Sequence, residues 1–225
     1  MNRFKKIIAG ILVFGIILSI IPKRAFASDN SVNSLKQDFI NKYTGVDLIS
    51  KNFERDRMTP KEEEAYNALL EIIYEENKFV ATDEGYTKEE YINLVDEVLS
   101  ENITIENIQS NGITFYSGAH GTISTKMLGG ILNGVITATL LVAGVGTVSE
   151  LIKKMGKEAA KEWVKKHVKK AVVNKLAAMG LGAFGIYAGN IIKGIVDAYL
   201  DSGQWLAERI DGRDKIPNNG YIELW

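Results

Sequence analysis

The sequence predicts a mainly α-helical fold, and three observations support this. Apolar residues recur at spacings of three and four through most segments of the chain. Two threonines stand where helix N-caps are expected, each followed three residues later by a glutamate. Two uncharged, glycine-rich runs lie on either side of a lysine-rich segment that itself has helical periodicity.

The first 27 residues predict a secretory signal peptide. Met1 to Lys6 is short and basic, Ile7 to Ile21 is apolar, and Ala25-Phe26-Ala27 provides the small residues that signal peptidase needs. A retained membrane anchor is the alternative, but this apolar run is short for a span. We therefore expect residues 1–27 to be removed and the mature protein to be secreted. It has no cysteine, so it has neither disulfides nor a thiol nucleophile.

Residues 28–116 are expected to form an acidic helical domain. Residues 28–125 hold 19 Asp and Glu against 8 Lys and Arg. A first helix is expected from Val32 to about Tyr43. Thr59 and Pro60 begin a second helix that extends to about Lys78, and Thr87 begins a third. The apolar face of the third helix comprises Tyr91, Leu94, Val95, Val98 and Leu99.

Two segments of different composition follow these helices. Residues 102–116 alternate apolar and polar side chains around Asn111-Gly112, which predicts a short hairpin. Small and turn-forming residues follow, at the point where the charge balance changes sign. We expect a flexible linker at 117–126.

Residues 127–200 are expected to form a glycine-rich helical hairpin or bundle. Gly130, Gly134 and Ala138 lie four residues apart in the uncharged run 127–149, and Gly185 and Gly189 repeat this spacing in the second run, 176–192. Small residues at that spacing allow two helices to pack closely, which is typical of helices in membranes. A soluble helical hairpin that uses these glycines in its own core is the alternative.

Between the two runs, residues 150–175 predict a cationic amphipathic helix. Leu151, Ile152, Met155, Ala159 and Trp163 share one face, opposite a row of lysines. Past Lys166 the segregation ends, and we expect a kink or a second helix there. The candidate membrane-surface residues are Lys153, Lys154, Lys157, Lys161, Lys165, Trp163 and Met155. A solvated surface helix is the alternative. Residues 201–225 form a C-terminal tail whose last residues are a small strand or a recognition segment.

The charge distribution and the absence of catalytic motifs narrow the range of functions that we expect. Residues 126–225 hold 14 Lys and Arg against 9 Asp and Glu, and the excess lies in lysines at 150–193. Lysine without arginine favours surface attraction over base recognition, so we expect an anionic bacterial membrane as partner and no nucleic acid. No catalytic motif is present, and His120 and His167 are the only histidines. We therefore expect no enzyme activity, no cofactor and no metal.

The order of signal peptide, acidic helical region and Gly-rich cationic helices resembles the secreted precursors of bacteriocin-type antimicrobial proteins of Gram-positive bacteria. The likeness covers residues 126–200, and Leu128-Gly129-Gly130 is similar to a double-glycine processing site. The resemblance implies membrane attack by apolar helices and a lysine patch. It also implies an acidic region that masks the cationic one, and a processing protease.

The sequence therefore predicts a secreted, membrane-permeabilising antibacterial protein, or its precursor, that associates with membranes and with itself. Two other interpretations remain. One is a secreted soluble helical domain that binds a protein partner or the cell envelope. The other is an immunity protein anchored in the producer's membrane by residues 127–149.

Overall fold

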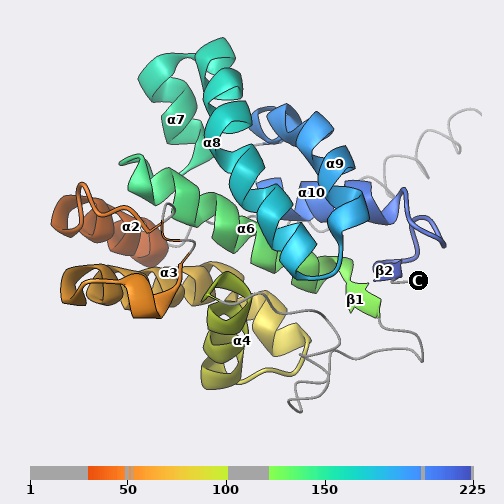
Figure 1. Ribbon diagram of the computed structural model, residues 1–225, viewed down its shortest axis with the longest axis horizontal. Coiled ribbons are helices and arrows are strands. Elements are labelled where there is room, and N and C mark those ends of the chain that lie inside the picture. Colours follow the sequence, from red (N-terminus) through yellow and green to blue (C-terminus); the bar gives the residue numbers. More distant parts are fainter. Residues whose placement is uncertain (1–29, 49–50, 52, 101–121, 199–200, 224–225) are drawn as a thin grey trace, which may run out of the picture.

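The computed structural model describes residues 30–48, 51, 53–100, 122–198 and 201–223. Within them the chain is mainly α-helical, as predicted, with eight α-helices, two 3-10 helices and one pair of short strands. Helix α6 (Thr125–Val142) crosses the middle of the molecule, between the helices of the acidic half and those of the basic half (Figure 1). The predicted signal peptide (1–27) and hairpin (102–116) lie outside the described residues.

The acidic half contributes helices α2 (Asn30–Lys42), α3 (Pro60–Asp83) and α4 (Lys88–Ser100). Thr59 and Glu62 form a capping box at the start of α3. Thr87 and Glu90 make the same reciprocal hydrogen bonds before α4. Helix α3 runs past the expected end because its apolar face continues to a buried Ala81. The sequence thus placed all three helices.

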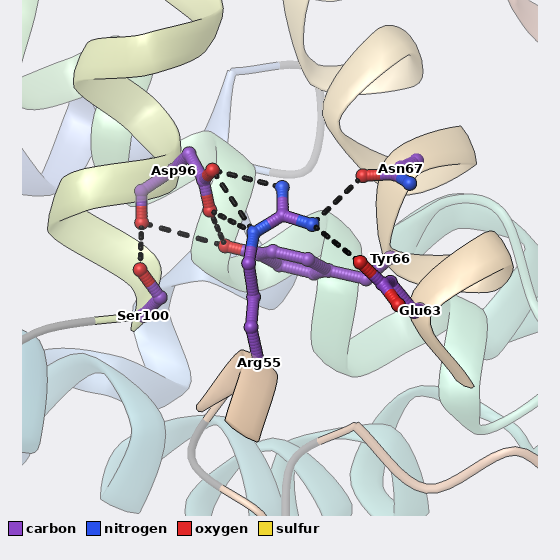
Figure 2. Close-up of polar contacts among 6 residues, drawn as sticks. All are labelled: Arg55, Glu63, Tyr66, Asn67, Asp96 and Ser100. Carbon is purple, nitrogen blue, oxygen red and sulfur yellow. Dashed lines mark hydrogen bonds and ion pairs between the residues drawn. The ribbon is translucent and has the colours of Figure 1, made fainter. Parts of the chain in front are cut away.

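A polar cluster fixes these helices to one another. Arg55, in the 3-10 helix η1 (Arg55–Arg57), donates hydrogen bonds to both carboxylate oxygens of Asp96 on α4. Its guanidinium also donates to Asn67 and lies 4.7 Å from the ring centre of Tyr66, both on α3. The Tyr66 hydroxyl donates to Asp96 at 2.8 Å, as Figure 2 shows. Burial, and then the Asp96 charge, raise the pKa of Tyr66.

The predicted cationic helix is two helices, and the break lies at Gly156 rather than past Lys166. Helix α7 (Val148–Met155) ends where Gly156 adopts φ 82°, and α8 (Lys157–Ala178) then runs without interruption. Glycine readily adopts a positive φ because it has no Cβ atom, and this backbone conformation ends the helix. Because of this break, the apolar face of α8 does not continue the apolar face of α7. The buried side chains of α8 are Ala160, Val164, Val168, Ala171, Val172, Lys175 and Leu176.

The remaining elements complete the basic half. Helix α9 (Gly182–Ile191) leads into the 3-10 helix η2 (Ile192–Val196), and α10 (Ser202–Asp211) follows. Strand β2 (Tyr221–Glu223) pairs antiparallel with β1 (Thr122–Ser124), directly before α6. Part of the expected linker, 122–126, therefore forms β1 and the start of α6, whereas 117–121 lies outside the described residues.

Both halves share one hydrophobic core. It includes Tyr66, Ile73 and Tyr91 from the acidic half, together with α6 and the buried faces of α8, α9 and α10. Helix α6 contacts α2, α3 and α4 on the acidic side and α8 and α10 on the basic side. The apolar helix at the centre is thus shared by elements that the sequence assigned to different domains.

The closest helix approach joins α6 to α10. A Cβ added at Gly203 would lie 2.3 Å from the backbone nitrogen of Asn133 and 2.3 Å from the backbone oxygen of Gly129. The Asn133 side chain donates to Asp201 at 2.8 Å and accepts from the Gly203 amide at 2.7 Å. Asp201 in turn caps α10 by accepting from the Gln204 amide. Only glycine fits at position 203, because backbone atoms cannot move aside as a flexible side chain can.

We expect Gly203→Ala to lower the free energy of unfolding by about 1–3 kcal/mol or more, because the new methyl group must push α10 away from α6. Urea denaturation of the folded protein measures this change. Gly182→Ala is the matched control, since its nearest foreign atom would be 3.8 Å away. Equal stability of both variants would contradict the packing described.

Candidate membrane-interaction site

Helix α6 is the one helix in the described part of the chain that is long and apolar enough to cross a membrane. In the folded chain, 83% of its residues are buried. The core helix of a soluble protein has the same character, so length and composition alone do not assign a span. The neighbours of α6 are therefore the informative part of the site.

The two glycines on α6 that were predicted for helix packing face the acidic half. A Cβ at Gly130 would lie 2.9 Å from the Tyr91 hydroxyl oxygen, and one at Gly134 would lie 3.1 Å from Ile73. Ala138, next on this row, is fully buried. The Tyr91 hydroxyl is buried and has no hydrogen-bond partner among the described residues. An unsatisfied buried hydroxyl is costly, so this part of the interface carries a polar defect.

Polar contacts also cross this interface. The Glu76 carboxylate on α3 accepts a hydrogen bond from the Thr137 hydroxyl on α6 at 2.8 Å and forms an ion pair with Lys36 on α2. Lys126, in the first turn of α6, pairs with Asp83 at 2.5 Å. These contacts fix the register of α6 against α2 and α3.

A buried lysine joins α8 to the acidic half. Lys175 is 3% exposed, and its ammonium group donates to the backbone oxygen of Leu99 near the end of α4. The ammonium also lies 5.7 Å from the ring centre of Phe53. Burial lowers the pKa of Lys175 to about 8. This contact therefore keeps a cation in the core at neutral pH, which is a cost that the fold must offset.

The predicted membrane-surface lysines lie on the outside of α7 and α8. Lys153, Lys154, Lys157 and Lys165 are exposed, and Lys161 is partly so. Lys157 pairs with Asp197 at 2.6 Å, and Lys161 pairs with Asp197 and Glu158. Exposed Lys166 and Lys170 extend this surface. We call these seven residues the α7–α8 lysine surface.

The other predicted residues pack within the protein. Met155 and Trp163 are partly buried against the core, and the Trp163 ring stacks on His167 with ring centres 4.7 Å apart. Gly185 and Gly189 face α8, where added Cβ atoms would lie 3.3 Å from Val173 and 2.7 Å from Lys169. The structure thus brings each glycine pair against a neighbouring helix of the same chain. It places Met155 and Trp163 beside the lysines without exposing them fully.

Sequence reasoning missed three residues of this site. Asn133 orients α10, Lys175 joins α8 to α4, and Asp197 holds two lysines of the α7–α8 lysine surface. Asn133 had a signal, since it is the one amide in the uncharged run 127–149. Lys175 had a signal as well, because it falls at helical spacing from Val168, Ala171 and Val172. Asp197 had none, since its partners lie far away in the sequence.

No protein-family model, no curated protein and no solved structure matches this chain. Within the described ranges, no group of three or more His, Asp or Glu side chains could hold a metal ion. The site therefore consists of an apolar helix, its glycine contacts and the α7–α8 lysine surface.

We expect the variant Lys153→Glu/Lys165→Glu to bind anionic vesicles at least about tenfold more weakly, because each lysine near an anionic surface contributes about 1 kcal/mol of attraction. Vesicle co-sedimentation measures this. Neither residue has an ion pair among the described residues, so the fold is left intact. Lys61→Glu/Lys215→Glu makes the same charge change at exposed positions elsewhere. If both variants lose affinity equally, net charge rather than this surface determines binding.

Proposed function

We propose that this protein is a secreted, membrane-active antibacterial protein, or its precursor, in a resting folded state. The burial of the apolar helix α6 between acidic and basic helices carries this proposal. A helix able to cross a membrane is kept out of water by neighbours, while the α7–α8 lysine surface remains available to anionic lipid. The proposed permeabilisation begins when α6 exchanges those neighbours for lipid.

The masking in this proposal concerns apolar surface more than charge. Helices α2, α3 and α4 contact α6, whereas the surface lysines Lys153 and Lys165 are exposed. Lys126–Asp83 is an ion pair that joins the two halves. The acidic half would thus act as a cover for α6, and its negative charge would be repelled from an anionic membrane once the lysines bind.

The face of α6 that the acidic half covers has features that favour its release from that half. Glycine costs about 1 kcal/mol relative to alanine in a helix, so Gly130 and Gly134 weaken α6 in water. The same glycines permit close helix association in lipid, where little apolar attraction between helices exists. Self-association of α6 through this face is therefore part of the proposal. The Tyr91 hydroxyl beside Gly130 has no hydrogen-bond partner among the described residues. This further lowers the free energy needed to separate the acidic half from α6.

A second candidate is a secreted soluble helical domain that binds a protein partner or the cell envelope. The continuous core favours it, since the glycine-rich helices are then permanent core elements. In this case α6 never leaves α3. The third interpretation, an immunity protein anchored by 127–149, places the same helix in the producer's membrane and requires the chain to remain in membranes after an alkaline wash.

A disulfide lock separates the first two candidates. The Cγ2, Cδ1 and Cγ1 atoms of Ile73 lie 3.1, 3.3 and 3.5 Å from the Cβ position of Gly134, so a sulfur atom at position 73 is close enough to bond to one at position 134. The natural chain has no cysteine, so Ile73→Cys/Gly134→Cys forms one defined bridge between α3 and α6. We expect the reduced variant to release dye from anionic vesicles and the oxidised variant to release at least about tenfold less.

The single variants Ile73→Cys and Gly134→Cys control for the substitutions themselves, because neither can form the internal bridge. Equal dye release by the oxidised and reduced double variant would show that α6 stays on α3 during permeabilisation. Absence of dye release in every form, including the unsubstituted protein, would favour the soluble binding domain.

A further inference from the structure

The second apolar segment, α9 with η2, is joined to α8 by ion pairs at one end as well as by buried apolar contacts. Residues 182–196 form the other apolar helical stretch of the described chain. Directly after it, Asp197 accepts ion pairs from Lys157 at 2.6 Å and Lys161 at 3.6 Å on α8. Lys193 within η2 pairs with Glu162 on α8. Three ion pairs therefore fasten one end of this segment to α8. Two of them use lysines of the α7–α8 lysine surface, and the third uses Glu162.

Beneath these pairs, apolar side chains of the segment are buried, namely Phe184, Ala188, Ile192, Ile195 and Val196. A bilayer offers these side chains another apolar environment. Gly185 and Gly189 of α9 pack against Val173 and Lys169 of α8. At these two positions α9 therefore contributes no side chain to the contact. On α9, Ile186 is 75% exposed. An isoleucine this exposed gains from transfer into an apolar phase. The segment thus already presents one apolar side chain on the surface of the protein.

The ion pairs are exposed and exchangeable. The side chains of Lys157 and Asp197 are 55% and 52% exposed. Pairs of this kind contribute little to stability and weaken with salt. The hydrogen bond between the two lowers the pKa of Asp197 and raises that of Lys157, so both are charged at neutral pH. Lysine binds a phosphate as readily as a carboxylate, because it acts as a point charge.

We propose that the phosphates of anionic lipids displace Asp197 from Lys157 and Lys161 and thereby release α9 and η2 from α8 into the bilayer. This inference rests on the proposed function and names its trigger. The lysines that fasten the segment are the lysines that meet the headgroups, so binding and release are one exchange. Free phosphate could compete for the same lysines, but it offers no apolar phase to Ile186.

A single-cysteine label tests this inference. Ile186→Cys introduces the chain's one thiol at an exposed position, where an environment-sensitive dye leaves the packing intact. We expect the dye emission to shift to the blue with vesicles that contain phosphatidylglycerol. We expect no shift with phosphatidylcholine vesicles or with inorganic phosphate.

A charge-matched pair of variants isolates the ion pairs. Asp197→Asn frees both lysines, so the labelled protein should reach half of the shift at an anionic lipid fraction about twofold lower. Glu158→Gln makes the same charge change beside Lys161, but Glu158 pairs only within α8, so it should behave as the parent does. Equal behaviour of the two variants would overturn the inference, as would a shift with inorganic phosphate alone.

Dye release from the same vesicles keeps the two proposals separate. Release without any shift of the Ile186 label would overturn the inference and leave the proposed function standing. A shift of the label without dye release would contradict permeabilisation and leave the exchange at Asp197 standing.

Discussion

The burial of α6 is the constraint on which the rest of the structure depends. An apolar helix of this length cannot remain in water alone, so both halves of the chain are arranged around it. Helices α3 and α4 cover one side, α8 and α10 cover the other, and β2 pairs with the strand that leads into α6. A change in the surroundings of α6 therefore alters the whole fold.

The two sides of α6 differ in how they hold it. Toward α10, backbone meets backbone at Gly203, and Asn133 makes two hydrogen bonds across the contact. Toward α3 and α4, the contact includes glycines, an ion pair at the surface and an unpaired tyrosine hydroxyl. A buried hydroxyl without a hydrogen-bond partner weakens the interface that contains it. The acidic side is therefore the one that we propose to separate on a membrane.

The sequence predicted what depends on local chemistry. The helix starts at Thr59 and Thr87 followed from capping, and the buried faces of α3 and α4 followed from periodicity. The break at Gly156 was missed because a glycine inside a periodic run has no single local outcome. The partners of Gly130, Lys157 and Lys175 depend on contacts between distant segments, which no local pattern encodes. The sequence predicted that the lysines lie on a surface, but it did not predict that Asp197 pairs with two of them.

Lipid-borne photo-crosslinking tests the central claim most directly, because it needs no substitution in the protein and reports which residues touch lipid. Photoactivatable lipids in anionic vesicles should label residues 125–142 of α6, and zwitterionic vesicles should leave them unlabelled. Labelling confined to the α7–α8 lysine surface, with α6 unlabelled while the protein is bound, would contradict the account. It would mean that α6 is a permanent core helix of a surface-binding domain.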